Sequence, residues 1–592
     1  MVTLGINMHH DASMCIVEDG KLLSFINTER ITRIKKDREL NQEVLDYVLE
    51  ASNKSFDDID NIACAYFRPN DFIKMYYTEE YDGFLHKDNI KVDWDRKVES
   101  HNKHGGEPLE FGYEFKGELM QLNHPHVNND GYTVSPNFFY CHFNINRRCI
   151  PGYFVNHHLA HNAAAYFTSD YKDACGFSLD GTGVYPIGSS MFCRATEERG
   201  LLQHYLPEIM LGTLYQERCV DLGFGDGTFK AGSMMGLAPY GKVLPIAVEM
   251  LEEVIAKNFN RKITNRDSSS LRWQWYKLIR NIPIPKEELH YSTEKSLDPT
   301  LIKPDSKIGR DLSASVQFQF ETGIMKYVKE LYDGLPYDNL VLSGGSFLNC
   351  TSNGNLRKNG PFKNIYLFPA CGDDGTALGA ALWTQHQWFK IPRHNWTNKE
   401  RMYGGREYKK YSSGDLDYEK VIEYLLDDNH VVAWFQGKSE IGPRALCNRS
   451  FLADPRNPNI RDHINFNVKN REWFRPFAPV VLAEKANEWF DLEGESPFML
   501  FASQVKKPEL IPGVTHVDGS ARPQTVTKED NPKMYKLLKL WEQKTGIPVL
   551  LNTSLNLGGE PLVETPEDAL DLFYRAKNNS KLSLVINNKI FN

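Results

Sequence analysis

The chain has 592 residues, 41% of them hydrophobic and 25% charged, with a net charge of -8. A chain of this length exceeds what one hydrophobic core accommodates, so we expect a globular protein of two or more domains. The negative charge argues against non-specific nucleic-acid binding, and the lack of a long apolar run argues against a membrane span.

The cysteine pattern and the N-terminus bear on location. The ten cysteines are scattered without a C-x-x-C pair, and the N-terminus lacks the basic and apolar regions of a signal peptide. We therefore expect a cytoplasmic protein without structural zinc.

The first residues predict a β-meander followed by a cluster of charges. Thr3–Asn7, Ser13–Val17 and Leu22–Ile26 are short apolar segments separated by polar turns, as expected of strands. His10 lies in the first turn. The cluster Glu29–Lys36 is either a solvated helix face or an anion-binding site, and its residues leave both interpretations open.

Two histidines and an acid occur in VNHHLAHNAAAYFTSDYKDACGFSLDGTG, residues 155–183. His157 and His161 are four residues apart in an alanine-rich run, so a helix would present both on one face. Ala174–Leu179 is typical of a buried strand, which delivers Asp180 to the turn Gly181–Gly183. This set suits a divalent metal such as Fe, Mn, Zn or Ni, although a bare His-x-x-x-His also occurs without any metal.

Glycine-rich turns follow two later predicted strands. Asn339–Ser343 leads into SGGSFLN, and Asn364–Pro369 leads into CGDDGTALG. A strand, a glycine turn and a helix start form an anion-binding helix N-terminus. Several such turns predict a nucleotide site, with the candidate residues Gly181, Gly183, Gly344, Gly345, Asn349 and Gly375. The loop GSMMGLAPYG, residues 232–241, is a weaker signal for a nucleotide.

Composition divides the chain into regions. Residues 68–150 are polar and aromatic with weak periodicity, and we interpret them as an insertion that forms a lid, a substrate collar or a dimer element. Residues 245–305 are expected to be helical and peripheral. A shift to Pro, Asn, Lys, Gly and Ser marks residues 396–416 as a linker between a domain over residues 1–395 and another over residues 417–592.

The second predicted domain places cations in unusual surroundings. Arg444 follows Gly-Pro, Lys469 and Arg475 lie with Arg471 in VKNREWFRPFAPVV, and Arg522 lies in SARPQTV. Cations beside prolines and apolar strands need an anionic partner. Arginine forks and a lysine charge suit phosphate or carboxylate, whereas salt bridges within the protein are the plainer explanation for each one alone.

Taken in order, the motifs HDAS, ERxTRxK, HHLAH, DGTG, GLAPYG, SGGxxxN, GDDGTALG, GPRAL, VKxREWFRPFAP and NTSLN resemble the O-carbamoyltransferases. That family includes the NodU nodulation enzymes and antibiotic- and toxin-pathway carbamoyltransferases, such as the one that acts on tobramycin. The resemblance covers nearly the whole chain, and residues 68–150 depart from it most. It implies an α/β protein with an actin/sugar-kinase-like, two-lobed N-terminal domain and a YrdC-like C-terminal domain.

The resemblance also implies a reaction. Carbamoyl phosphate would be hydrolysed to carbamate in the C-terminal domain, and carbamate would attack the α-phosphate of ATP to give carbamoyladenylate and pyrophosphate. A hydroxyl of a small natural product would then take the carbamoyl group in the N-terminal domain. The metal, with Fe(II) expected and Mn or Zn as alternatives, would be held by His157, His161, Asp180 and Asp373. His10 and Lys35 would face the carbamoyl group, and the phosphates would be bound by Arg444, Lys469, Arg475, Arg522 and Ser554.

Two other functions stay open. A tRNA threonylcarbamoyladenosine-type enzyme would need a basic surface, of which the net charge of -8 gives no sign. A non-catalytic nucleotide-binding regulator would have no use for the cations of the second domain. The acceptor is set by variable loops rather than by these motifs. The resemblance leaves sugars, macrolactam antibiotics and saxitoxin-type alkaloids open as acceptors, and the Asn- and Lys-rich composition favours a hydroxymethyl saxitoxin-type precursor. We expect no nucleic-acid or membrane partner, and a homodimer is one use of the insertion.

Overall fold

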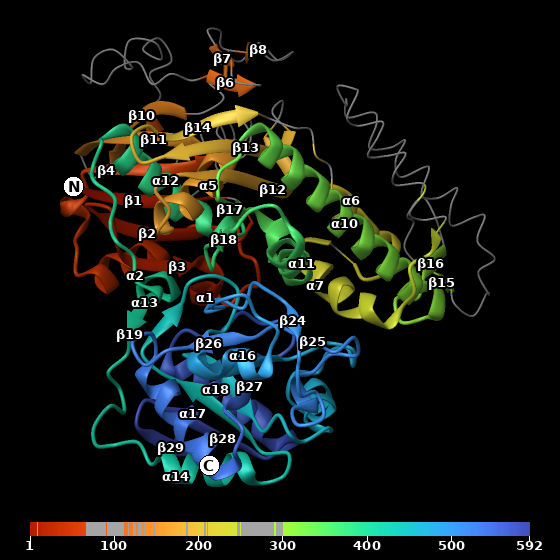
Figure 1. Cartoon of the computed structure of the whole chain (residues 1–592). Helices are drawn as coiled ribbons and strands as arrows, with labels where there is room; N and C mark the ends of the chain where they lie inside the picture. Colours follow the sequence, from red (N-terminus) through yellow and green to blue (C-terminus); the bar gives the residue numbers. More distant parts are fainter. Residues whose placement is uncertain are drawn as a thin grey trace.

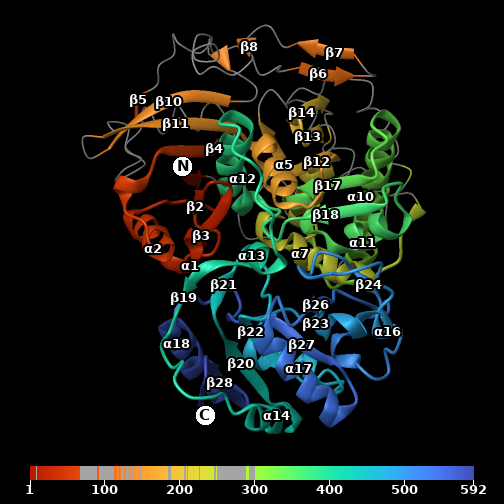
Figure 2. The same cartoon turned by 60° about the vertical axis from the view of Figure 1, so that its left-hand side comes forward.

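The computed structural model describes residues 1–8, 10–66, 148–184, 188–205, 209, 211–225, 227–245 and 300–592, together with 90–91, 112–115, 118–121, 126–127, 133–134, 138–145, 249 and 289–291. Most of the expected insertion and of residues 245–305 lies outside the described residues. The chain forms an upper part, coloured red to green, and a lower part, coloured teal to blue (Figures 1 and 2). None of the described helices is long and apolar enough to cross a membrane.

The first sheet of the upper part is built on the predicted meander. Its strand order is β3-β2-β1-β4-β11-β10-β5, with β1 antiparallel to β2 and parallel to β4. Asp19 and Gly20 form the β2–β3 turn with φ angles of 48° and 80°, which a tight hairpin turn requires. The elements are β1 (Val2–Asn7), β2 (Ser13–Glu18), β3 (Lys21–Asn27), α1 (Thr28–Thr32), α2 (Gln42–Ser52), β4 (Asn61–Tyr66), β5 (Ile90–Lys91), β10 (Phe138–Ile145) and β11 (Arg148–Asn156).

The second sheet has the order β14-β13-β12-β17-β18, with β12, β17 and β18 parallel. Two alanine-rich helices join the sheets, because small side chains allow close approach. A Cβ on Gly379 of α12 would lie 1.8 Å from the carbonyl oxygen of Ala160 in α5. The elements are α5 (His157–Thr168), β12 (Ala174–Val184), β13 (Gly188–Thr196), β14 (Gly200–Tyr205), β17 (Asn339–Ser343), β18 (Asn364–Leu367) and α12 (Thr376–Leu382).

Helices cover the outer face of the second sheet and continue toward the lower part (Figure 1). Their apolar residues form one core with the sheet that includes Phe177, Phe320 and Leu342. The elements are α6 (Leu211–Asp221), α7 (Gly227–Leu237), η4 (Ala238–Tyr240), α10 (Lys307–Gly334), η6 (Gly345–Leu348), α11 (Cys350–Asn359) and η7 (Asp373–Gly375). The upper part is thus two-lobed, as expected.

The lower part is a third α/β unit with its own cores on the two faces of one sheet. Its strand order is β26-β23-β27-β22-β20-β28-β29. The elements are α14 (Tyr418–Leu426), β20 (Val431–Phe435), β22 (Arg449–Ala453), α15 (Ile460–His463), η9 (Ile464–Val468), β23 (Ala478–Leu482), α16 (Ala486–Trp489), β26 (Gln524–Val526), α17 (Pro532–Thr545), β27 (Val549–Ser554), α18 (Pro566–Ala576), β28 (Leu582–Ile586) and β29 (Lys589–Phe591).

The predicted linker, residues 396–416, contains regular structure. It includes α13 (Asn398–Met402) and β19 (Tyr403–Glu407), and β19 pairs with β21 (Lys438–Glu440) of the lower part. This segment therefore joins the two parts through backbone pairing. The α/β fold class is confirmed, and the predicted domain limits stay a prediction.

Candidate active site

Helix α5 begins at the first predicted metal ligand. Asn156 Oδ1 accepts hydrogen bonds from the backbone N of His158 (2.9 Å) and of the next residue (3.2 Å), a side-chain cap that starts the helix at His157. One turn later His161 lies on the same face, with its ring centroid 4.5 Å from that of His157. His158 faces another way, and its Nδ1 lies 3.2 Å from Ser178 Oγ.

The four predicted metal ligands meet where the two lobes join. Asp180 comes from β12, and Asp373 begins the short helix η7 after β18. Asp180 Oδ2 lies 3.2 Å from Nε2 of both His157 and His161. Asp373 Oδ1 lies 3.5 and 3.4 Å from the same two nitrogens. One donor atom from each of the four buried side chains lies within 4.8 Å of the others.

Backbone groups fix the orientation of Asp180. Its Oδ1 accepts hydrogen bonds from Gly181 N (2.9 Å) and Gly345 N (3.2 Å), which leaves Oδ2 directed at the histidines. The neighbouring Gly344 has a φ of +98°, and a Cβ there would lie 2.1 Å from Leu179 O. Only glycine fits at that position. The backbone N–H groups of Gly181 and Gly345 therefore hold the Asp180 carboxylate in place.

These residues fit a divalent metal. Burial alone would lower the pKa of His161, but hydrogen bonds and charge from Asp180 and Asp373 raise it to about 9. Burial and the charge of Asp373 oppose ionisation of Asp180, yet hydrogen bonds from the two histidines keep its pKa low. Two buried carboxylates converging on two imidazoles are a set that a divalent cation satisfies.

His10 lies beside this cluster, together with Asp11 and Lys36. His10 Nε2 is 3.1 Å from Asp373 Oδ2, and its Nδ1 is 3.1 Å from Asp11 Oδ2. Lys36 Nζ lies 3.0 Å from the same Asp11 oxygen. Burial alone would lower the pKa of His10, whereas Asp373 and Asp11 raise it to about 9. The predicted Lys35 is placed differently: its Nζ pairs with Glu29 at 2.9 Å.

The other predicted nucleotide residues have structural contacts of their own. Gly181 and Gly183 belong to β12. A Cβ on Gly375 would lie 1.9 Å from Ala370 O, so this glycine allows the turn before α12. Asn349 caps α11 by accepting from Ser352 N at 3.1 Å. These placements leave the predicted nucleotide role untested.

A group of cations gathers in the lower part, and we call it the cation cluster. It consists of Arg444, Lys469, Arg471, Arg475 and Arg522. Lys469 Nζ is 2.6 Å from Ser554 O, 3.2 Å from Ser554 Oγ and 3.0 Å from Asn556 Oδ1. Burial, followed by the charges of Arg471 and Arg475, lowers the pKa of Lys469 well below its ordinary value.

Cations this close repel one another until an anion joins them. Burial and the charge of Arg522 lower the pKa of Arg444 to about 9. Among the described residues, Arg444 Nε and Arg471 Nη2 are buried without a hydrogen-bond acceptor. Buried donors without acceptors are costly, so the cluster is suited to phosphate oxygens. Four of the five predicted phosphate-binding residues belong to this cluster, and the fifth, Ser554, contacts Lys469.

Two residues at this site were not among the predicted phosphate-binding residues: Arg471, which belongs to the cation cluster, and Asn556, which contacts Lys469. Arg471 Nε donates to Asn465 Oδ1 at 2.8 Å, and burial together with Arg475 lowers its pKa well below the ordinary value. Arg471 and Asn556 each stand two residues after a predicted phosphate-binding residue, Lys469 and Ser554 respectively. That spacing is the sequence signal that would have pointed to them.

The upper part contacts the cation cluster directly. Arg444 Nη2 donates to Leu348 O in the SGGxxxN turn at 3.3 Å. Arg475 Nη1 donates to Ser233 Oγ of α7 at 2.9 Å. The GLAPYG loop, which gave a weak nucleotide signal, packs on the lower part: the rings of Tyr240 and Trp473 lie 5.0 Å apart. The glycine turns and the cation cluster therefore adjoin.

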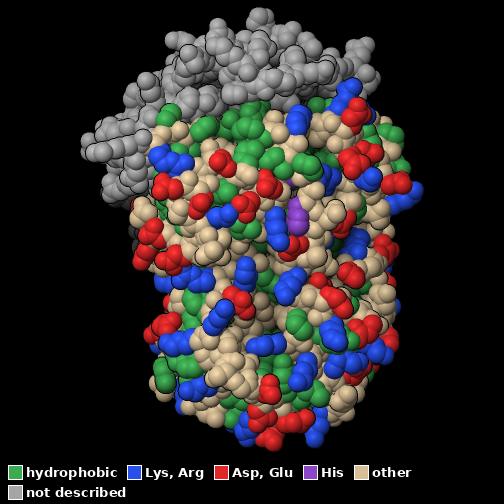
Figure 3. Space-filling view, turned by 90° about the vertical axis from the view of Figure 1, so that its left-hand side faces the viewer, with side chains coloured by type: hydrophobic (Ala, Val, Ile, Leu, Met, Phe, Trp, Pro, Cys, Tyr) green, Lys and Arg blue, Asp and Glu red, His purple; other side chains and the backbone are tan. Residues whose placement is uncertain are grey.

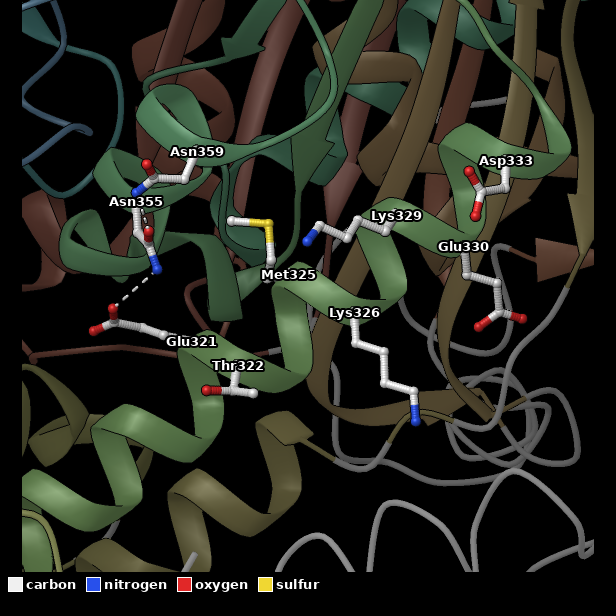
Figure 4. A pocket seen from close by; sticks show the side chains of 9 residues that line it. All are labelled: Glu321, Thr322, Met325, Lys326, Lys329, Glu330, Asp333, Asn355 and Asn359. Atoms are coloured by element: carbon white, nitrogen blue, oxygen red, sulfur yellow. Dashed lines mark hydrogen bonds between the residues drawn. The ribbon is translucent and has the colours of Figure 1, made fainter.

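A hollow of about 790 Å³ lies on α10 and α11 (Figure 4). Lys326, Lys329, Glu330 and Asp333 line it with mixed charge. Figure 4 shows Asn355 in contact with Glu321 at its edge, at 3.4 Å. Its lining contains none of the candidate metal, nucleotide or phosphate residues.

Fold and site together define a class: a two-lobed α/β protein with a buried His/Asp cluster between its lobes, joined to an α/β unit that carries a cation cluster. Models described as carbamoyltransferase N-terminus and carbamoyltransferase C-terminus match residues 2–382 and 424–591. The chain therefore belongs to the O-carbamoyltransferase family and is a carbamoyl-transferring enzyme.

Individual relatives agree with the family models. Nodulation protein NolNO of Sinorhizobium fredii is 32% identical over 95% of this chain and 76% of that protein. The 3'-hydroxymethylcephem-O-carbamoyltransferase of Amycolatopsis lactamdurans is 33% identical over 57% of this chain and 61% of that protein. Among solved structures, the activator of 2-hydroxyisocaproyl-CoA dehydratase from Clostridium difficile aligns over 66% of this chain and 96% of that chain, at 10% identity and a TM-score of 0.31.

Proposed function

We propose that this chain is an ATP-dependent O-carbamoyltransferase that makes carbamoyladenylate from carbamoyl phosphate and ATP. It then transfers the carbamoyl group to a hydroxyl of a small natural product. The observation that carries this proposal is the cation cluster, in which two buried donors, Arg444 Nε and Arg471 Nη2, lack acceptors among the described residues and which adjoins the glycine turns of the upper part.

The cation cluster would perform the first chemistry. Arginine forks and the Lys469 charge hold the phosphate of carbamoyl phosphate, and water releases carbamate and phosphate. A carbamate oxygen then attacks the α-phosphorus of ATP, and the bond to the leaving pyrophosphate breaks. The arginines offset the negative charge that grows on the pyrophosphate oxygens.

The His/Asp cluster would be the place of transfer. The acceptor oxygen attacks the carbamoyl carbon, the bond to AMP breaks, and His10 Nε2 takes the hydroxyl proton. Asp11 orients the imidazole through Nδ1. The charge of Asp373, which is a main cause of the raised pKa of His10, would be neutralised by a bound metal. The pKa of His10 would then fall, and the imidazole could accept a proton. A divalent metal, for which we propose Fe(II), would be held by His157, His161, Asp180 and Asp373 and would supply Lewis-acid polarisation.

For the acceptor we propose a hydroxymethyl group on a cationic, saxitoxin-type alkaloid. Support comes from the carboxyl group of Asp11 beside the His/Asp cluster, whose Oδ2 lies 3.1 Å from His10 Nδ1. A relative is named for 3'-hydroxymethylcephem, which also presents a hydroxymethyl group. Mass spectrometry of a panel of cephem, sugar and alkaloid alcohols, read for one added carbamoyl group, tests the acceptor.

Pyrophosphate release separates this proposal from its alternatives. The wild-type protein should release pyrophosphate from ATP only when carbamoyl phosphate is present. A threonylcarbamoyladenosine-type enzyme would instead require threonine and bicarbonate, and a regulator would release none. The face in Figure 3 mixes acidic and basic side chains rather than presenting a broad basic patch, which favours a small acceptor over tRNA.

Two substitutions in the cluster extend the test. Arg475→Ala and Arg444→Ala should each lower carbamoyl-phosphate-dependent pyrophosphate release by about 100-fold or more, because each removes a guanidinium that binds phosphate. Arg456→Ala is the matched control, since Arg456 pairs with Asp454 at 2.7 Å on the same part and outside the cluster. Normal release in both cluster variants would refute the assignment.

We also propose a reducing, cytoplasmic location. Eight cysteines are buried in the described part of the chain, and no disulfide joins them to one another. Free buried thiols are typical of proteins in reducing compartments. A homodimer stays a proposal, which sedimentation of the purified protein tests.

A further inference from the structure

The ERxTRxK motif places two arginines at the boundary between the upper and lower parts. Arg30 of α1 is 3% exposed, and its Nη1 and Nη2 donate to the carbonyl oxygens of Glu440 and Gly442 at 2.5 and 2.7 Å. Arg33 follows one turn later, and its Nη1 and Nη2 donate to Leu562 O and Pro561 O at 2.6 and 3.0 Å. Each guanidinium therefore forks onto two backbone carbonyls of the lower part.

The carbonyls held by Arg30 lead into the cation cluster. Gly442 stands two residues before Arg444 and has a φ of +89°, and a Cβ there would lie 2.5 Å from Pro369 O. The side chain of Glu440 holds the other end of the same loop, since its Oε1 accepts from the backbone N of Arg449 at 2.8 Å. Arg30 thus anchors the beginning of the segment that presents Arg444.

The carbonyls held by Arg33 lead to the other side of the cluster. The next residue, Val563, donates from its backbone N to Leu555 O at 3.1 Å. Asn556 Nδ2 donates to Glu560 O at 2.6 Å, and Asn556 Oδ1 accepts from Lys469 Nζ at 3.0 Å. Movement of the backbone at 561–562 would therefore move the oxygens that hold Lys469.

We propose that Arg30 and Arg33 are positioning residues for the cation cluster, so that the upper part sets the geometry of the phosphate chemistry in the lower part. The inference rests on the proposed function. Neither arginine touches a phosphate; each acts through the loop that carries Arg444 or the loop that holds Lys469. Because misplacement of binding groups by about 1 Å costs up to about 100-fold in rate, loosening these loops should be visible in kinetics.

Arg148 offers a matched control for Arg33. Its Nη1 and Nη2 donate to Phe56 O and Ile59 O at 2.6 and 3.0 Å, the same fork at the same distances, but within the upper part. The side chains of Arg33 and Arg148 are 31% and 34% exposed. The substitutions Arg33→Met and Arg148→Met therefore remove equivalent interactions, and only the first should affect the cluster.

The experiment measures carbamoyl-phosphate-dependent pyrophosphate release and thermal unfolding of full-length variants. Arg33→Met and Arg30→Met should raise the KM for carbamoyl phosphate about 10-fold or more, whereas Arg148→Met should leave it within about twofold of the wild type. Arg33→Lys should show a smaller rise in the KM for carbamoyl phosphate than Arg33→Met, since one ammonium reaches one of the two carbonyls. A loss of folded protein alone would lower kcat without a change in KM.

Binding of pyrophosphate, measured by calorimetry without turnover, gives a second readout. Arg33→Met should weaken it relative to Arg148→Met even if the wild type proves to use another reaction. If the wild type releases no pyrophosphate with carbamoyl phosphate, the proposed function fails, and the calorimetric comparison still decides the positioning role. Equal KM values and equal pyrophosphate affinities for the Arg33 and Arg148 variants would overturn the inference.

Discussion

Replacing Gly345 with alanine tests how Asp180 is held in the His/Asp cluster and whether the cluster binds a metal. A Cβ at this position would lie 2.8 Å from Asp180 Oδ1, whereas ordinary contacts begin at 3.4 Å. The carboxylate would have to move by roughly half an ångström, and the hydrogen bond from Gly345 N would lengthen. Metal–ligand distances tolerate about 0.2 Å, so Asp180 could not keep its place as a ligand.

The expected loss follows from what supporting contacts contribute to metal sites. Removing a partner that orients a ligand costs about 10- to 100-fold in metal affinity, or about 1.4 to 2.7 kcal/mol. Titration of metal-stripped protein with Mn²⁺ in a calorimeter, and with Fe(II) under nitrogen, measures it. Gly345 lacks a positive φ, so the alanine introduces no backbone strain of that kind.

Gly232→Ala is the control for this substitution. Gly232 lies in α7, and a Cβ there would meet nothing within 4 Å. Its metal affinity should equal that of the wild type, and alanine should favour the helix slightly. If Gly345→Ala binds both metals within about twofold of the wild type, then Asp180 is not positioned as described.

Three further predictions concern the two clusters. His161→Ala should lose stoichiometric metal in elemental analysis, while His158→Ala should retain it, because of these two histidines only His161 faces Asp180 and Asp373. Burial and neighbouring cations depress the pKa of Lys469 below 10.5, so the unfolded chain binds more protons at this residue and the free energy of unfolding rises with pH toward that value. Lys469→Met should remove this part of the pH dependence, measured by urea unfolding at a series of pH values. Arg471→Met should raise the KM for carbamoyl phosphate about 10-fold while Arg456→Met does not, and equal KM values would exclude Arg471 from the phosphate site.

Local patterns predicted much of the fold. The strand expected at Asn339–Ser343 has those limits in the structure. Helix α10 begins at Lys307, because Ser306 caps it by accepting from Gly309 N at 3.1 Å. Caps of this kind depend on one hydrogen bond and are hard to locate from hydrophobic periodicity.

The candidate site was predictable where its chemistry depends on residue type. It was less predictable where the chemistry depends on the direction in which a side chain points. His157, His161, Asp180 and Asp373 are brought together as expected. Lys35 and Lys36 are adjacent and chemically alike, and the pattern could not decide which one reaches Asp11. Charge alone also gave no sign that Arg30 would bind backbone carbonyls rather than an anion.

The hydrogen bond between Arg475 and Ser233 links anion binding in the cation cluster to helix α7 of the upper part. Arg475 Nη1 lies 2.9 Å from Ser233 Oγ of α7, and Glu472 Oε1 lies 3.4 Å from the same hydroxyl. An anion that draws the guanidinium toward itself must compete with this hydroxyl, so helix α7 exchanges one partner for another as the cluster fills. By linkage, whatever stabilises either arrangement of α7 alters anion affinity by the same factor. The hydrogen bond between Arg475 and Ser233 therefore couples anion binding in the cation cluster to the arrangement of helix α7 in the upper part.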